Sequence, residues 1–193
     1  MKYTKVTFDP LELEFNEETK VLNGFAIGDT VEAALNKFSV TNGIATITDA
    51  NGKAKGLQDA IGTGDIIAIT DANGLDYDKY VILVYGDVNG DSKINLLDFV
   101  IIKNQILRGD RLEGLFLEAA DVRPKTEGVD LLDFVGMKNY ILKGTEIEQI
   151  RQEKAPEEVP GEDVEPGGEE EVPDEDIEEP DKEEEVPDEE IVE

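Results

Sequence analysis

Residues 85–99 read "YGDVNGDSKINLLDF" and form the most informative segment of the sequence. Oxygen-bearing side chains crowd its first part, and an apolar run follows. If residue 87 is position 1 of a loop, such side chains occupy positions 1, 3, 5, 9 and 12, and position 7 offers a backbone carbonyl. This is the ligand spacing of an EF-hand-like calcium loop, because calcium takes about six to eight oxygen ligands. The residues are Asp87, Asn89, Asp91, Lys93, Asn95 and Asp98.

The loop departs from the usual calcium motif in two places. Ser92 stands at position 6 where glycine is usual, and Asp98 stands at position 12 in place of the longer Glu. A strand-like segment, "YVILVYG" (80–86), also replaces the helix that normally enters such a loop. The alternative is an Asx-rich turn that caps a helix at Asn95 without any metal. Five correctly placed oxygens favour calcium.

The helix that follows the loop is repeated further along the chain. "INLLDFVIIKNQILRG" (94–109) aligns with "VDLLDFVGMKNYILKG" (129–144) at an offset of 35 residues, and ten of sixteen positions are identical. In both copies apolar residues recur with the spacing of one helix face, and Gly109 and Gly144 stand where helix C-caps are expected. We therefore expect two similar helices packed through Phe99, Ile102 and Ile106 and through Phe134, Met137 and Ile141. Residues 111–120 should form a short connecting helix.

A duplicated calcium loop without its entering helix resembles a dockerin. Dockerins are small calcium-dependent modules that attach bacterial enzymes and other proteins to cohesin domains on scaffoldins. The resemblance covers about residues 85–145. It implies that Asn95 acts on the ion through water, and that the direct ligands are Asp87, Asn89, Asp91, the Lys93 carbonyl and Asp98.

The second loop departs further from the family. "DVRPKTEGVDLLD" (121–133) spans thirteen residues, and Arg123 and Lys125 bring two positive charges to the region where a divalent ion would sit. One alternative is that one of these cations pairs with a loop carboxylate in place of the ion; the carboxylates are Asp130 and Asp133. The other is a distorted site formed by Asp121, Glu127, Asp130 and Asp133. We expect one calcium ion, with a second doubtful.

Apolar residues outside the packed helix faces, fringed by polar residues, predict a partner site. By the dockerin resemblance, this is the cohesin-contacting surface. Its predicted residues are Leu96, Leu97, Val100, Ile101, Lys103, Asn104 and Leu107 in the first copy, and Leu131, Leu132, Val135, Lys138, Asn139 and Leu142 in the second. The alternative is that Leu97 and Leu132 simply join the core. Two like helices could each present the same surface, so that the module docks in either orientation. Because Ile101 corresponds to Gly136, we expect the two faces to be unequal and the first helix to dominate binding.

Residues 1–84 read as a small β-rich α+β module. "ITDANG" occurs at 47–52 and at 69–74, and Asn-Gly is a strong hairpin signal. A helix capped by Thr30 is expected over 30–38. The expected strands are 3–8, 20–26, 44–49, 65–70 and 79–85. The module resembles those found immediately before dockerins in secreted proteins of anaerobic bacteria.

One acidic stretch of this module could suggest a carboxylate pair for glycoside hydrolysis. Its residues are Asp9, Glu12, Glu14, Glu17 and Glu18. The alternation along "LELEF" (11–15) explains them equally as the solvated face of a strand. No catalytic site is therefore predicted.

Composition excludes several classes of function. The chain has no Cys, no His and only two Ser, so a Ser-His-Asp triad, a Cys-His pair and a thiolate or imidazole zinc site are impossible within it. A net charge of −29 argues against nucleic acid as a partner. No apolar run approaches the roughly 20 residues of a membrane span, so membrane insertion is not expected. Residues 151–193 hold 22 acids, three bases and six of the eight prolines, a composition typical of disorder.

Together these patterns predict an α+β chain in three parts: a β-rich module (1–84), an all-α dockerin-like module (85–146) and a disordered acidic linker or tail (147–193). The expected function is non-catalytic, calcium-dependent binding of a cohesin domain, which attaches a parent protein to a scaffoldin or cell-surface complex in polysaccharide degradation. The free chain should be monomeric. Residues 1–10 lack the apolar region of a secretory signal, so either the protein stays inside the cell or Met1 begins an excised fragment of a longer chain. The dockerin resemblance implies the second, a fragment of a secreted protein that is extracellular or associated with the cell surface. The alternatives are a calcium-binding structural module that packs on its own parent chain and a glycoside hydrolase fragment.

Overall fold

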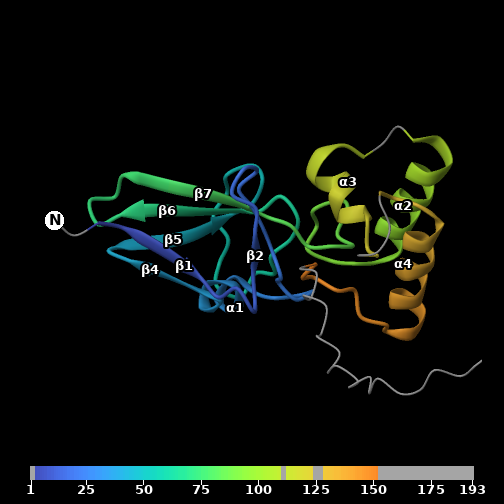
Figure 1. Cartoon of the computed structure of the whole chain (residues 1–193), viewed down its shortest axis with the longest axis horizontal. Helices are drawn as coiled ribbons and strands as arrows, with labels where there is room; N and C mark the ends of the chain where they lie inside the picture. Colours follow the sequence, from blue (N-terminus) through green and yellow to red (C-terminus); the bar gives the residue numbers. More distant parts are fainter. Residues whose placement is uncertain (1–2, 110–111, 124–127, 152–193) are drawn as a thin grey trace, which may run out of the picture. The chain divides into compact units, whose positions relative to one another are not determined.

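The computed structural model describes residues 3–109, 112–123 and 128–151, and it is α+β with a β-rich N-terminal region (Figure 1). The described residues form seven strands and four helices. The predicted acidic tail, from residue 152 onward, lies outside the described residues.

The N-terminal strands form two sheets. The larger has the order β2-β3-β7-β6-β5, in which only β3 and β7 pair in parallel. The smaller consists of β1 and β4, which pair in antiparallel fashion. The strands are β1 (Lys5–Phe8), β2 (Glu14–Phe15), β3 (Val21–Asn23), β4 (Phe38–Thr41), β5 (Gly43–Thr48), β6 (Ile66–Asp71) and β7 (Asp76–Ile82). All five expected strands are present, and the structure adds two strands outside the expected ranges, β2 and β4.

The two "ITDANG" segments behave differently. At the second, the Gly74 N–H donates to the Asp71 carbonyl at 3.0 Å and the Asp71 N–H donates to the Leu75 carbonyl at 2.8 Å, which closes the β6–β7 hairpin. At the first, Gly52 makes the same kind of turn. The chain then returns only as far as a single bridge between Thr48 and Ala54. Only one of the two predicted hairpins therefore joins full strands.

The helix expected over 30–38 is α1 (Val31–Asn36), and it ends two residues early. Thr30 caps it as predicted, because its side chain accepts the Ala33 N–H at 3.2 Å. Phe38, expected on the helix, instead begins β4 opposite Phe8. The rings of Phe8 and Phe38 lie 5.8 Å apart, so burial against β1 outweighs helical propensity at this position.

Two hydrophobic cores hold the described residues together. The first lies within the β-rich region and includes Leu22, Phe25, Ile67 and Ile82, all fully buried. The second lies among α2 (Leu96–Arg108), α3 (Gly114–Ala120) and α4 (Leu131–Lys143). The predicted connecting helix is thus present but begins at residue 114. Val21 and Leu83 of the β-rich region join the second core.

The packing of α2 on α4 confirms the predicted helix faces at Phe99, Ile102, Phe134 and Met137. Ile106 packs on the second core, whereas Ile141 is half-buried and is not part of it. The rings of Phe99 and Phe134 stack with centroids 4.4 Å apart. Ile102 and Met137, one turn further along, are fully buried. Both helices end at glycines in the left-handed conformation, Gly109 and Gly144, as the sequence indicates.

Residues 147–151, predicted to begin the tail, pack against the rest of the fold. Ile147 is buried in the second core. The Gln149 side chain accepts a hydrogen bond from the Tyr85 N–H at 2.8 Å and donates one to the Tyr85 carbonyl at 3.0 Å, as the backbone of a neighbouring strand would. Asn23 also donates to the Gln149 carbonyl at 2.8 Å. This segment therefore ties the end of α4 to the β-rich region.

Candidate functional site

The first loop is built around the carboxylate of Asp87, which is only 1% exposed. Its Oδ1 accepts the N–H groups of Gly90 at 2.9 Å and Asp91 at 3.2 Å. Its Oδ2 accepts the N–H groups of Ser92 at 3.1 Å and Thr63 at 3.0 Å. The loop backbone thus wraps around the side chain at position 1.

Two further residues close the loop onto α2. Asp98 is fully buried, and its carboxylate accepts the N–H groups of Val88 at 3.2 Å and Asn95 at 2.9 Å. Asn95 is the N-cap of α2, and its Oδ1 accepts the Leu97 N–H at 2.8 Å. The helix-capping alternative and the calcium-loop prediction therefore describe the same local geometry.

The middle of the loop is a run of Asx turns. Asn89 Oδ1 accepts the Asp91 N–H at 2.9 Å, and Asp91 Oδ1 accepts the Lys93 N–H at 3.0 Å. Ser92, which occupies the position where glycine is usual, has φ +65°. The loop therefore makes the tight turn that glycine normally supplies, even with a side chain present.

The electrostatics of this loop favour a cation. Burial raises the pKa of Asp87. Burial, followed by the charges of Asp87 and Asp91, raises the pKa of Asp98 to about 6. In the described part of the chain, no Lys or Arg forms an ion pair with Asp87, Asp91 or Asp98. A bound cation would offset this uncompensated negative charge.

The donor set fits a hard cation through its mixture of oxygens. Within residues 3–109, 112–123 and 128–151, no three acidic side chains lie close enough to hold a metal by themselves. Asn89, Asn95 and the Lys93 carbonyl would have to complete the ligand set. Carboxylate, amide and carbonyl oxygens are the ligands that calcium takes.

The second loop repeats the closing part of the first. Asp133 is fully buried and accepts the N–H groups of Arg123 at 3.0 Å and Asp130 at 2.8 Å. These bonds match those of Asp98 after the offset of 35 residues, which takes Val88 to Arg123. The same offset takes Asp87 to Val122, a buried apolar residue. The second loop therefore has no carboxylate at the position of Asp87.

Asp121, one residue before that position, is paired with an arginine from outside the loop. Arg151 Nη1 lies 3.3 Å from Asp121 Oδ2, and Nη2 donates to the Asp121 carbonyl. The guanidinium also lies over the Tyr85 ring, 3.7 Å from its centroid. Lys125 and Glu127, named in the two alternatives for this loop, lie outside the described residues.

Sequence reasoning missed Arg151 altogether. Its only sequence signal is that it is an isolated base before the acidic tail. Thr63 was missed as well, because nothing in its surroundings in the sequence indicates that its N–H reaches Asp87.

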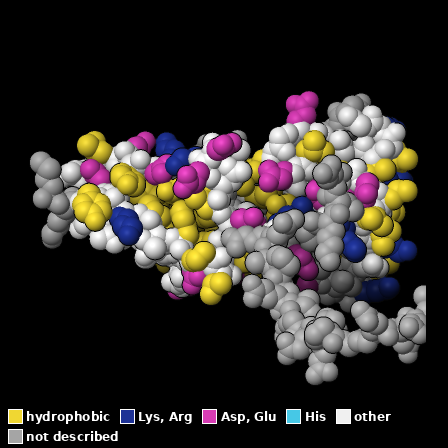
Figure 2. Space-filling view, viewed as in Figure 1, with side chains coloured by type: hydrophobic (Ala, Val, Ile, Leu, Met, Phe, Trp, Pro, Cys, Tyr) yellow, Lys and Arg dark blue, Asp and Glu magenta, His cyan; other side chains and the backbone are white. Residues whose placement is uncertain are grey.

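The predicted partner surface is exposed on both helices. Leu97 is 54% and Leu132 48% exposed, so these residues do not join the core. Figure 2 shows hydrophobic side chains beside Lys and Arg side chains where Figure 1 places α2 and α4. The other exposed members are Leu96, Val100, Lys103 and Leu107 on α2, and Leu131, Val135, Lys138 and Leu142 on α4. Asn104 and Asn139 are half-buried at its edge.

Ile101 differs from the other predicted partner residues. It is half-buried and packs on the second core. Its counterpart Gly136 also faces inward, because a Cβ there would lie 3.0 Å from Val122 Cγ2. The difference between the two copies therefore lies inside the module, away from the exposed faces.

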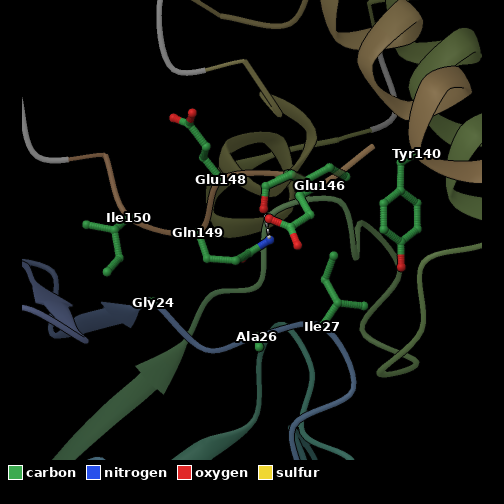
Figure 3. Close-up of a pocket in the computed structure, with 9 residues that line it drawn as sticks. Gly24, Ala26, Ile27, Tyr140, Glu146, Glu148, Gln149 and Ile150 are labelled. Atoms are coloured by element: carbon green, nitrogen blue, oxygen red, sulfur yellow. Dashed lines mark hydrogen bonds between the residues drawn. The ribbon is translucent and has the colours of Figure 1, made fainter. Parts of the chain in front are cut away.

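A mainly apolar hollow of about 550 Å³ lies away from both loops (Figure 3). Tyr140 of α4 and Ile27 of the loop after β3 lie on one side of it. Gly24, Ala26 and residues 146–150 line the rest. Two of the acidic residues that could suggest a carboxylate pair for glycoside hydrolysis, Asp9 and Glu14, make hydrogen bonds that support the local structure. Asp9 accepts the Leu11 N–H at 2.9 Å, and Glu14 accepts from Asn23 at 2.9 Å.

Comparison with known families identifies part of the chain. Residues 85–123, which include the first loop, α2 and α3, match the model of the dockerin type I domain. The dockerin resemblance inferred from the sequence is thereby confirmed for this segment. No curated protein and no solved structure gave a significant match to the chain. None of the helices in the described residues is long and apolar enough to cross a membrane.

Proposed function

We propose that this chain is a non-catalytic anchoring module that binds a cohesin domain in a calcium-dependent manner. The dockerin type I match over residues 85–123 supports this proposal. In such a role the module attaches its parent protein to a scaffoldin or cell-surface complex. We place that complex outside the cell, in polysaccharide degradation.

The observation that carries the proposal is the exposed apolar face repeated on α2 and α4. Leu96, Leu97, Val100 and Leu107 are each exposed, as are Leu131, Leu132, Val135 and Leu142. Protein interfaces combine an apolar centre with a polar rim, which Lys103 and Lys138 would provide here. Contiguous exposed apolar residues on so small a module indicate a partner surface.

The calcium ion belongs to the first loop in this proposal. Asp87, Asn89, Asp91, Asp98 and the Lys93 carbonyl would hold it, with Asn95 acting through water. The ion would supply positive charge to a loop in which the carboxylates of Asp87 and Asp98 are both buried. Because Asn95 and Asp98 both cap α2, a filled loop would also fix the start of the helix that carries Leu96 and Leu97.

We propose a single ion, because the second loop has Val122 in the place of Asp87. Asp121 already has a cationic partner in Arg151. A guanidinium beside a carboxylate supplies the charge that an ion would otherwise bring.

The test is capture of the full chain on a panel of immobilised cohesins, in calcium and in chelator. Capture that needs calcium supports the proposal. Calcium binding without capture by any cohesin would favour a structural module that packs on its own parent chain. Glycosidase turnover by the isolated chain would contradict a non-catalytic role.

A further inference from the structure

We infer that residues 62–65 of the β-rich region, braced by the side chain of Lys55, form the outer wall of the first calcium loop and set its affinity for calcium. The inference rests on the proposed calcium binding by this loop. It assigns a positioning role to residues that contribute no ligand themselves.

The most direct contact is between Thr63 and Asp87. The Thr63 N–H donates to Asp87 Oδ2 at 3.0 Å, beside the N–H of Ser92 at 3.1 Å. The Thr63 hydroxyl also donates to the Val84 carbonyl at 3.0 Å. Both residues are almost fully buried. The carboxylate at loop position 1 is therefore oriented by a backbone group from a different part of the fold.

The two segments are also in steric contact through glycine. A Cβ at Gly62 would lie 2.6 Å from Asp87 Oδ2 and 2.8 Å from Ser92 Cα. A Cβ at Gly90 would lie 2.8 Å from the Thr63 carbonyl oxygen. Contacts this short do not occur between real side chains and backbone, so no residue larger than glycine fits without moving the loop.

A buried ion pair braces this wall. Asp65 is 3% exposed, forms a salt bridge with Lys55 and accepts the Gly62 N–H at 2.8 Å. Lys55 Nζ also lies 3.1 Å from Ser92 Oγ in the loop. A polar hollow of about 610 Å³ beside these residues is lined by Asn89, Asp91 and Ser92 and leaves the loop reachable from solvent.

These contacts imply that calcium binding and the folding of the wall are linked. A ligand that binds best to one arrangement of Asp87 stabilises everything that holds that arrangement, and the linkage is reciprocal. Disturbing residues 62–63 should weaken calcium binding, and calcium should in turn protect residues 62–65 from opening.

The first experiment compares two glycine-to-alanine variants of the full chain by calorimetry with calcium. Gly62→Ala inserts a methyl group against Asp87, whereas in Gly56→Ala the new Cβ lies 3.4 Å from Asp59 Oδ2, an ordinary contact. We expect Gly62→Ala to raise the calcium Kd at least ten-fold, and Gly56→Ala to leave it within two-fold of wild type. Melting temperatures in chelator, measured in parallel, separate this effect from a general loss of stability.

The second experiment needs no variant and therefore remains valid if Gly62→Ala fails to fold. Amide hydrogen exchange of the wild-type chain is measured in calcium and in chelator. We expect the Thr63 amide to exchange at least ten-fold more slowly in calcium, while amides of β5 exchange at the same rate in both.

The outcomes separate the two proposals. If the wild-type chain gives no calcium-binding heat, the proposed calcium function fails. If wild type binds calcium but Gly62→Ala binds with the same Kd, or if exchange changes over residues 87–98 but not at Thr63, calcium binding stands and the inferred wall is wrong.

Discussion

Asp87 and Asp121 both begin a loop in the sequence, yet their surroundings give them different roles. Asp87 is enclosed by four backbone N–H groups, and in the described residues it has no cationic partner. Asp121 is paired with the guanidinium of Arg151. A buried carboxylate that only N–H groups neutralise still attracts a cation, whereas one already paired with arginine has less to gain.

This contrast predicts unequal effects of two substitutions. Asp87→Ala should abolish calcium binding and, because it orphans several buried N–H groups, should lower the free energy of unfolding in chelator by at least about 3 kcal/mol. Asp121→Ala should leave one calcium-binding event. Calorimetry and urea unfolding of both variants provide the measurement. Two equal calcium events in wild type would contradict the single-ion proposal.

At the scale of elements, α2 and α4 are two copies of one capped helix. Asn95 and Asp130 cap them in the same way, and each forms a capping box with an aspartate three residues later. Their inner faces meet through Phe99 and Phe134. Their outer faces carry matching leucines at similar exposure.

The matched outer faces change the expectation for partner binding. From the sequence, Ile101 was expected to make the first helix dominant, but Ile101 packs inward. We now expect Leu96→Asp with Leu97→Asp to weaken cohesin binding less than ten-fold, because the α4 face remains. Leu131→Asp with Leu132→Asp should cost about the same, and all four changes together should abolish capture.

The control for these variants is Leu75→Asp. Leu75 is 66% exposed, similar to Leu96 and Leu131, but it lies in the turn between β6 and β7. It should leave cohesin affinity unchanged. Complete loss of binding on changing one leucine pair alone would show that the two faces are not equivalent.

At the scale of the whole described fold, residues 147–151 bind segments that are distant in sequence. Gln149 bonds to Tyr85, and the Arg151 N–H donates to Glu14 at 2.9 Å. The Arg151 side chain meets Asp121 and the Tyr85 ring. The short segment after α4 therefore contacts the β-rich region at Glu14, the residue Tyr85 just before the first loop, and Asp121 of the second loop.

This arrangement predicts that Arg151 stabilises the fold. Arg151→Gln removes the partner of a largely buried carboxylate and a cation–π contact, so the free energy of unfolding should fall by about 2–4 kcal/mol. Arg108→Gln, which removes an exposed base from the last turn of α2, should cost less than about 1 kcal/mol. Urea unfolding compares the two variants. Equal losses would show that the Arg151 contacts contribute nothing specific.

The same variant also tests the second loop. If Arg151 only stabilises structure, Arg151→Gln should still bind one calcium ion by calorimetry. A second binding event in this variant would show that the guanidinium excludes an ion that the loop can otherwise hold.

The features that depend on neighbouring residues along the chain could be predicted from the sequence. The 12-residue spacing of oxygens, the caps at Asn95 and Gly109 and the apolar faces of the two helices all follow from local backbone geometry. Such features depend on residues within a few positions of one another, and they appear in the structure as the sequence indicates. The dockerin match covers the first loop and the first of these helices, within residues 85–123.

The distant groups that contact these local features could not be predicted from the sequence, and they became visible only in the folded chain. The Thr63 N–H binds Asp87, which is 24 positions away in the sequence, and Arg151 binds Asp121, which is 30 positions away. Phe38 lies in β4 rather than in the predicted helix, and it packs on Phe8. The hydrogen bonds of Asp133 likewise show that Val122, rather than Asp121, is the residue of the second copy that corresponds to Asp87. Such pairings arise from burial and the closing of long loops, and no spacing in the sequence encodes them.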